Sequence, residues 1–289
     1  MNTVNLGNLS KPVLVCGGAY GNLQALEKLA ELQCTLDIAD NHVVHTGDAV
    51  AYCADTSASV QYIASRRWHA IKGNVEEQIA LGGDDCGCGF EQGSACDAAS
   101  VRWYAHSVAT LSADARQWMA ALPAQLIFSM GGITAHVVHG SLLRSNRFMF
   151  ASLPDVEFQI ELDQAAVDLV IAGHTGIPFT KAVGHRYWHN SGALGMPAND
   201  GTGRVWASVL RPALNGLDIT HHAIEYDAVT AARRIRAQDL PPVYAEALET
   251  GLWPSLDILP DTEKTATGMP LNLAGKTIHI TRPASISAG

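Results

Sequence analysis

The pattern of apolar and polar residues predicts alternating strands and helices in the first half of the chain. An apolar run at 12–16 predicts a buried strand, and after Asn22 the residues Leu23, Leu26 and Leu29 recur at the spacing of one helix face. The same criteria predict strands at 43–44 and 68–72, and helices at 57–67, 98–109 and 113–121. Residues 81–96 are rich in Gly, Asp and Cys and predict an ordered loop or insertion.

The second half of the chain is dominated by predicted strands. They lie at 125–129, 133–138, 169–172, 179–183, 186–189, 205–210 and 217–221. Strand–helix alternation followed by consecutive strands indicates an α/β fold, with a mixed sheet or two packed sheets and helices outside. A helix is predicted after Tyr226, and the remaining residues, which include several Pro and Gly, are expected to lie along the surface.

Composition narrows the class of protein. The 289 residues are 47% hydrophobic and 16% charged, which supports a sizeable core, and the net charge of −9 argues against a general nucleic-acid or anionic-membrane surface. We see no apolar run long enough to span a bilayer and no secretory signal at residues 1–12. The six cysteines are then expected to stay reduced, and the protein to be cytoplasmic.

Four short segments place a residue able to bind a metal at the end of a predicted strand, each beside a glycine. These residues are Asp48, Asn74, His139 and His174. Side chains on loops at the ends of a rigid sheet are well placed to form a site. Their mixture of oxygen and imidazole nitrogen suits a borderline divalent ion such as Mn, Fe, Zn or Ni. The same residue types also cap turns, so any one segment alone means little.

The order of these segments resembles the calcineurin-like metallophosphoesterase superfamily over about residues 12–210. That family has Asp-x-His-Gly-Asn, then Gly-Asp, Gly-Asn-His-Asp or Gly-Asn-His-Glu, His-Gly and Gly-His-x-His. The matching segments are Gly-Ala-Tyr-Gly-Asn at 18–22, Gly-Asp at 47–48, Gly-Asn-Val-Glu at 73–76, His-Gly at 139–140 and Gly-His-Thr-Gly at 173–176. The resemblance implies two packed, mostly mixed sheets flanked by helices over residues 1–225. Residues 226–289 would form a helical and irregular extension packed on that domain.

The resemblance also implies that one half of a two-metal site is degraded. In the family, one metal is held by the early Asp and His, a shared Asp and the final His, and three of these positions are Gly18, Tyr20 and Gly176 here. The ligands of the second metal are all present, as Asp48, Asn74, His139 and His174. The family's His after Asn, which assists the leaving group, is Val75. A divergent member with one complete metal half-site is therefore expected.

Other residues could rebuild the missing half. Tyr20 can act as a tyrosinate ligand, or its ring can pack over the vacated space. The cysteines that follow the metal-binding loops form a second candidate set: Cys53, Cys86, Cys88 and Cys96. Thiolates would select a softer ion such as Zn or Fe, and the alternative is a set of buried, incidental thiols.

Candidate substrate contacts are Asn22, Arg144 and Arg147. The two arginines closely follow His139-Gly140, and a guanidinium matches phosphate oxygens in pairs; the alternative is two solvated surface arginines. Asn22 belongs to the first of the motifs that carry the resemblance.

Three functions follow from these observations. The first is a metal-dependent phosphoester hydrolase for a soluble phosphorylated small molecule or nucleotide, with Asp48 and His139 as catalytic residues and one divalent ion, or two at most. The second is a non-catalytic sensor or scaffold that binds a metal or a phosphorylated ligand. The third is a redox or sulfur-centred metal chemistry at the cysteines. The oligomeric state stays open, and no nucleic-acid or membrane partner is expected.

Overall fold

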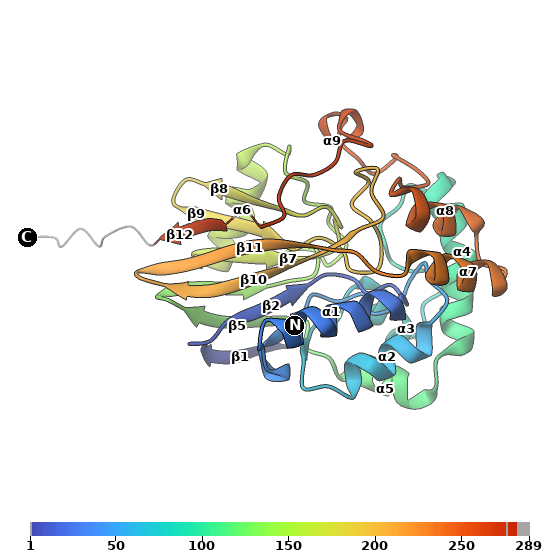
Figure 1. Ribbon diagram of the computed structural model, residues 1–289, viewed down its shortest axis with the longest axis horizontal. Helices are drawn as coiled ribbons and strands as arrows, with labels where there is room; N and C mark the ends of the chain where they lie inside the picture. Colours follow the sequence, from blue (N-terminus) through green and yellow to red (C-terminus); the bar gives the residue numbers. More distant parts are fainter. Residues whose placement is uncertain (1, 276, 282–289) are drawn as a thin grey trace, which may run out of the picture.

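The chain folds into two facing β-sheets covered by helices (Figure 1). This computed structural model describes residues 2–275 and 277–281. Each sheet has six strands within those residues, and both sheets mix parallel and antiparallel neighbours. The predicted architecture of two packed mixed sheets flanked by helices is therefore confirmed.

The first sheet has the strand order β1-β5-β6-β7-β9-β8. Its strands are β1 (Thr3–Asn8), β5 (Gln125–Met130), β6 (Ile133–Val137), β7 (Leu169–Ala172), β8 (Phe179–Val183) and β9 (Arg186–Asn190). Strands β6, β7 and β9 run parallel, whereas β5 and β8 pair antiparallel with β6 and β9. Strands β6 and β7 therefore end at the same edge of the sheet.

The second sheet has the order β12-β11-β10-β2-β3-β4. Its strands are β2 (Val13–Cys16), β3 (Val43–His45), β4 (His69–Ala70), β10 (Val205–Ala213), β11 (Gly216–Ile224) and β12 (Thr277–Thr281). Strands β2, β3 and β4 run parallel, and β10 joins them antiparallel through β2. Strands β3 and β4 also end at one common edge.

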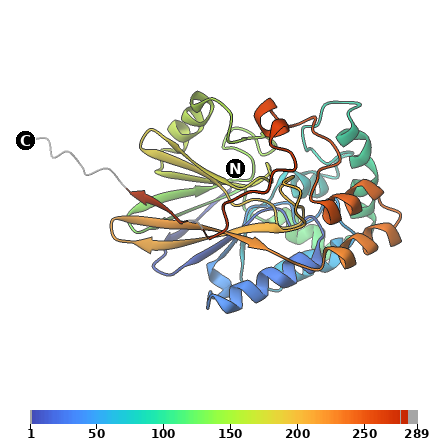
Figure 2. The ribbon, with the colours of Figure 1, turned by 45° about the horizontal axis from the view of Figure 1, so that its top comes forward.

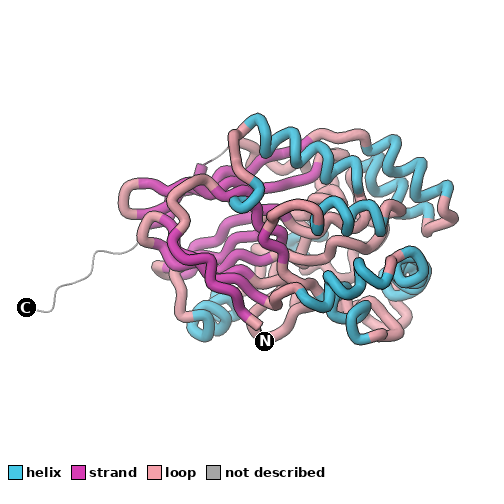
Figure 3. Tube along the Cα trace, turned by 90° about the horizontal axis from the view of Figure 1, so that it is seen from below, coloured by secondary structure: helices cyan, strands magenta, loops and turns pink. Residues whose placement is uncertain are grey.

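Helices cover the outer face of each sheet. Seven of the described helices share one buried apolar cluster with the second sheet, some against the sheet and others against neighbouring helices. They are α1 (Leu23–Thr35), α2 (Thr56–Ala64), α3 (Asn74–Leu81), α4 (Ala95–Thr110), α5 (Ala113–Ala121), α7 (Ala228–Ala237) and α8 (Pro242–Thr250). Helix α6 (Asp155–Ala165) covers the first sheet, on the opposite side from α1 (Figure 2). The short α9 (Asp261–Thr265) has no buried residue. Figure 3 shows the strands gathered together and most helices at the other end of the molecule.

The central strands are buried on both faces. In β2, Val13 and Val15 point into the core between the sheets, whereas Leu14 and Cys16 point toward the helices. The same alternation divides the residues of β7 between the core and α6. These strands are continuous apolar runs because neither face meets solvent.

Several elements differ from the sequence prediction. Helix α3 was not predicted. The loop expected at 81–96 is present at 82–94, between α3 and α4. Helix α3 buries only Val75 and Ile79 as apolar side chains, too few to give a clear helical period. Strand β1 and helix α6 were also missed, and β1 is exposed along most of its length.

The C-terminal part is more than a surface segment, contrary to the prediction. The helix expected after Tyr226 is α7, and α8 places Tyr244 and Leu248 in the core shared with the second sheet. Strand β12 extends that sheet by pairing with β11. The prediction for residues 282–289 lies outside the described residues. Across the described part of the chain, no helix is long and apolar enough to cross a membrane.

Candidate metal centre

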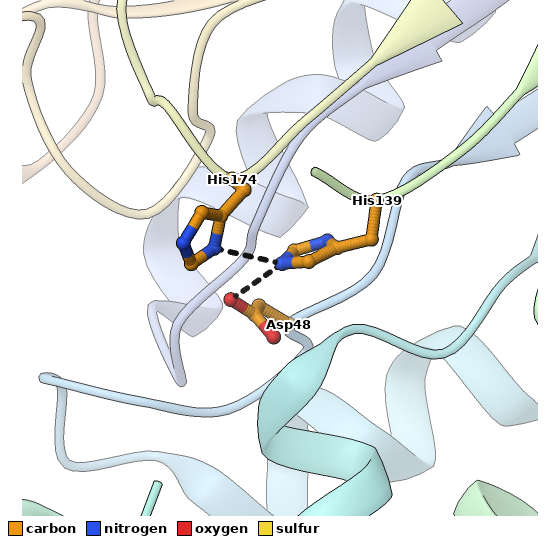
Figure 4. Close-up of side chains that lie close together, drawn as sticks. All are labelled: Asp48, His139 and His174. Atoms are coloured by element: carbon orange, nitrogen blue, oxygen red, sulfur yellow. Dashed lines mark hydrogen bonds and ion pairs between the residues drawn. The ribbon is translucent and has the colours of Figure 1, made fainter. Parts of the chain in front are cut away.

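The four predicted ligands come together at the carboxyl ends of two parallel strand pairs. Asp48 follows β3 and Asn74 opens α3 after β4, whereas His139 and His174 follow β6 and β7. Each pair of neighbouring parallel strands delivers its loops to one edge of its sheet, and the two edges face each other. Figure 4 shows the side chains of Asp48, His139 and His174 pointing toward one another from separate loops.

The donor atoms converge on Nε2 of His139. This atom lies 3.1 Å from Asp48 Oδ2, 3.1 Å from His174 Nδ1 and 3.0 Å from Asn74 Oδ1. Two ligands about 2.1 Å from one ion, at a right angle to each other, are about 3 Å apart, so these distances suit a shared ion. A search of the described residues for clustered His, Cys, Asp and Glu side chains finds one group that could hold a metal. It consists of Asp48, His139 and His174, whose ligand atoms all lie within 4.8 Å of one another.

Neighbouring backbone groups fix the orientation of two ligands. His139 Nδ1 lies 2.6 Å from the carbonyl oxygen of Thr46, so Nδ1 carries a proton and Nε2 is the nitrogen that faces the site. The Asn74 amide donates to the carbonyl of Cys86 at 2.9 Å, which turns its Oδ1 toward His139. Asp48 Oδ1 accepts from the N–H of Val75 at 3.3 Å, leaving Oδ2 for the site.

Glu76 connects the two loops of the second sheet. Its Oε2 accepts hydrogen bonds from the N–H groups of Asp48 at 2.8 Å and Gly73 at 2.7 Å, and its Oε1 accepts from Ala49 at 2.7 Å. The side chain is fully buried. Burial, with the neighbouring Asp48 carboxylate, raises the pKa of Glu76 to about 7, although the three N–H groups oppose this rise. Glu76 thereby holds the Asp48 and Asn74 loops at a fixed separation.

The buried Asp48 carboxylate favours a positive charge beside it. Burial lowers the pKa of His139, but the Asp48 carboxylate outweighs burial and raises that pKa to about 9. Burial and then the neighbouring His139 lower the pKa of His174 to about 3. Burial disfavours an ionised Asp48, yet His139 holds the pKa of this carboxyl below its usual value. A divalent cation satisfies the same carboxylate, amide oxygen and imidazole nitrogens at once, so the residues fit a metal.

Three residues around the site have left-handed backbone. The φ angles are 53° at Tyr20, 59° at Asp48 and 54° at His174. This conformation is uncommon for residues other than glycine and costs of order 1–3 kcal/mol each. Such conformations cluster at functional sites because the surrounding structure imposes them.

Aromatic rings fill the degraded half of the family's two-metal site. A Cβ on Gly18 would lie 2.1 Å from Cε1 of Tyr20, so the buried Tyr20 ring occupies the space of a side chain at position 18. A Cβ on Gly176 would lie 3.4 Å from the indole of Trp253. Of the two interpretations of Tyr20, this geometry favours a ring packed over the vacated space.

The predicted cysteine ligands lie near the candidate metal centre. They do not belong to the metal-binding group found among the described residues. Cys88 Sγ is 3.4 Å from Asn74 Nδ2, and Cys88 and Cys96 line a cavity together with Asp48 and His174. Cys53 is buried, and its thiol contacts the carbonyl of Gly195 at 3.7 Å. A second metal at these thiols therefore stays a prediction.

The first predicted substrate contact, Asn22, lies inside the protein. Asn22 is buried and caps α1: its Oδ1 accepts from Ala25, and its amide donates to Gly195 and Tyr226. This favours a structural role for Asn22 in place of the predicted substrate contact.

The two arginines also differ. The Arg147 guanidinium binds Glu157 and, at 2.7 Å, the fully buried Glu161. These ion pairs hold the loop after His139. Because the Arg147 guanidinium is already paired with two carboxylates, this geometry favours a structural role over phosphate binding. Arg144 is exposed on the same loop, so phosphate binding there stays a prediction.

Sequence reasoning missed several residues of the site. Glu76 is one of them. Its place three residues after Gly73, at the start of a helix, is the usual signal for a side chain that returns to the N-terminal backbone. Phe148 and Trp253 carry no local signal, because only the fold brings them beside His174 and Gly176.

Comparisons with known proteins identify the family and the fold. The chain matches the calcineurin-like phosphoesterase superfamily domain over residues 15–209. A search of curated proteins finds no significant match. Among solved structures, the chain is similar to the hypothetical protein PH1004 from Pyrococcus horikoshii OT3, with a TM-score of 0.71 and 16% identity over 84% of this chain and 99% of that chain.

Two further structures share the fold. The chain is similar to a metallophosphoesterase from Sphaerobacter thermophilus, with a TM-score of 0.66 and 20% identity over 84% of this chain and 100% of that chain. It is also similar to Vps29 from Chaetomium thermophilum, with a TM-score of 0.50 and 11% identity over 96% of this chain and 99% of that chain. Because the domain match at 15–209 covers more than half of the 289 residues, the chain belongs to the calcineurin-like phosphoesterase superfamily.

Proposed function

We propose that this protein is a metal-dependent phosphoester hydrolase that uses a mononuclear centre. The observation that carries this proposal is the convergence of one carboxylate, one amide oxygen and two imidazoles within a phosphoesterase fold. Asp48, Asn74, His139 and His174 would hold the ion. The substrate would be a soluble phosphorylated small molecule, with nucleotides included in that class.

The protein side chains would position the ion, and the ion would supply the chemistry. A bound divalent ion supplies a Lewis acid for a phosphoryl oxygen and lowers the pKa of water. The Nδ1–H group of His139 donates to the carbonyl oxygen of Thr46, so Nε2 would be the nitrogen that binds the ion. Asp48 brings a negative charge whose direction is fixed by Val75 and Glu76. One protein carboxylate in the ligand set leaves a net positive centre that attracts a phosphoryl group.

Val75 limits which leaving groups can depart. This side chain is fully buried and stands where the family has a proton-donating His, so it offers no proton. An ester whose alcohol leaves readily without protonation, such as a phenol with a pKa near 10, is then favoured over an alkyl ester. We expect the rate of hydrolysis to depend steeply on the pKa of the leaving alcohol.

The second candidate function is a non-catalytic protein that binds a metal or a phosphorylated ligand. The replacement of family ligands and of the proton donor by Gly18, Val75 and Gly176 favours it. The two candidates differ in turnover and agree in metal binding, so a rate measurement separates them.

The test compares His139→Ala with His136→Ala. His136 lies on β6, close to His139 in sequence, but is half-buried and contacts Gln125 instead of the metal-binding group. With Mn²⁺ and p-nitrophenyl phosphate or its bis-ester, we expect His139→Ala to lower the rate at least about a hundredfold and His136→Ala to retain it. Equal rates for wild type and His139→Ala would refute the proposed function. Metal binding without any turnover in wild type would favour the second candidate.

A further inference from the structure

A cavity of about 70 Å³ lies directly beside the candidate metal centre. Asp48 and His174 form part of its wall, and most of the rest is aromatic or apolar. The aromatic side chains that face it include Tyr20, Tyr52, Phe90, Phe148, Tyr244 and Trp253. Such a wall with a few polar groups at one end is typical of a small-molecule site.

Part of this wall lies outside the superfamily match. The match ends at residue 209, whereas Tyr244, Trp253 and Ile258 come from α8 and the segment that leads to α9 (Figure 1). The lining also includes Phe90, from the loop between α3 and α4. The cavity is therefore shaped partly by segments outside the superfamily match, and Asp48 and His174 of the candidate metal centre form part of its wall.

Trp253 is held rigidly against the degraded half-site. Its indole Nε1 donates to the carbonyl of Pro197 at 2.6 Å, and its backbone N–H donates to Asn199 Oδ1 at 2.8 Å. The indole then lies over Gly176, where a larger side chain would meet it. A fixed aromatic face loses little conformational entropy when a ligand ring stacks on it.

The remaining rings are also positioned before any ligand binds. Phe148 lies over the His174 imidazole, with ring centroids 4.3 Å apart and an interplanar angle of 31°, and Phe150 stacks on Phe148 at 6.0 Å. Tyr20 packs edge-on against Tyr52 at 4.9 Å, and Tyr52 contacts Tyr244 at 4.8 Å. The aromatic wall thus extends from a candidate metal ligand to the C-terminal helices.

We propose that the cavity lined by the rings that fill the degraded half-site binds an aromatic ring carried by the phosphorylated ligand. This inference rests on the proposed function, since the phosphoryl group would lie at the metal-binding residues. None of the described residues that line the cavity is Arg or Lys, so recognition comes from stacking and apolar contact with an uncharged ring. A closed cavity that holds benzene measures about 150 Å³. This space of about 70 Å³ therefore takes up only part of a single ring, and a fused purine fits it less well still.

Binding of uncleavable ligands tests the pocket without requiring turnover. The probes are phenylphosphonate and methylphosphonate, titrated by calorimetry into the full chain with Mn²⁺. We expect phenylphosphonate to bind about tenfold more tightly. Trp253→Ala should remove most of this difference, and Trp253→Phe should keep it. Trp118→Ala, at a half-buried tryptophan on α5 away from the cavity, is the matched control and should also keep it.

The outcomes separate this inference from the proposed function. Equal affinity for the two phosphonates, or a preference that survives Trp253→Ala, would overturn the pocket even if the protein hydrolyses phosphoesters. A Trp253-dependent preference for the phenyl ligand without any hydrolysis would support the pocket and refute the proposed function. The phosphonate analogue of UMP distinguishes the carrier of the ring: tighter, Trp253-dependent binding of this analogue supports a pyrimidine nucleotide, and tighter binding of phenylphosphonate supports a simple aryl ester.

Discussion

The ring of Tyr20 fills the position that a side chain on Gly18 would occupy. A Cβ added to Gly18 would lie 2.1 Å from Tyr20 Cε1 and 2.5 Å from Cζ, far inside van der Waals contact. The two replacements therefore depend on each other: the large ring fits because the neighbouring residue has no side chain. Two of the three positions that depart from the family's ligands are therefore coupled by packing.

Gly18→Asp, which introduces the ligand that the family has at this position, should destabilise the protein. The new side chain collides with Tyr20 in a buried site, and overpacking of this kind costs about 1–3 kcal/mol. Urea unfolding of wild type and variant measures the loss. The double variant with Gly18→Asp and Tyr20→His is the control, because the smaller imidazole makes room; it should recover much of the lost stability. A single variant as stable as wild type would show that the Tyr20 ring moves aside freely.

The protein should bind about one divalent ion per chain, because only one ligand set is complete. Elemental analysis of protein purified without chelators or an affinity tag measures this ratio. His174→Ala should lose the ion, and His136→Ala should retain it. Since a ligand that binds only the folded state raises stability, a chelator should lower the Tm of wild type and leave His174→Ala unaffected. About two ions per chain would instead point to Tyr20 or the cysteines as ligands.

Glu76→Gln should weaken both stability and metal binding. An amide offers one accepting oxygen, so at least one of the three N–H groups that Glu76 satisfies would face an N–H₂ group. We expect a loss of about 1–3 kcal/mol in the free energy of unfolding and about tenfold or more in metal affinity. Glu77→Gln is the matched control on the same helix, where the carboxylate accepts from Ser145 at a partly exposed position. Similar effects at both positions would argue against a specific role for Glu76.

Stability should fall as the pH drops below about 6.5, partly because of a histidine between the sheets. His221 Nε2 lies 3.2 Å from Thr180 Oγ1, and burial followed by the neighbouring His222 lowers the pKa of His221 from 6.5 to about 4. The folded state keeps this imidazole neutral, whereas the unfolded chain takes up a proton below pH 6.5. The contribution is therefore fully present above that pH and is lost as the pH falls toward 4.

The substitution His221→Gln removes the contribution of this histidine to the pH dependence of stability. By about pH 5 the wild type should have lost about 2 kcal/mol through His221 relative to about pH 7.5, and the variant should lose that much less. Urea unfolding at the two pH values gives the comparison. The same substitution at the exposed His185 controls for the loss of one histidine at the surface. An equal pH dependence for wild type and His221→Gln would refute the assignment.

Much of the fold was predictable because its strongest signals are local. The apolar run at β2 and the helical spacing of α1 are both present in the structure, since a strand buried on both faces and an amphipathic helix leave clear patterns. Elements that bury few side chains were missed. Strand β1 exposes most of its residues, and its pairing with β5 joins segments far apart in the chain, which no local pattern records.

The sequence by itself determined the identities and order of Asp48, Asn74, His139 and His174, and with them the superfamily. It also determined that Gly18, Tyr20 and Gly176 depart from the family's ligands, because these are facts of residue type and spacing. Only the tertiary structure decided what replaced those ligands. Tyr20 fills the space beside its neighbour Gly18, and Trp253 reaches Gly176 from a distant part of the chain. The shape of the cavity next to them depends on packing that local sequence does not encode.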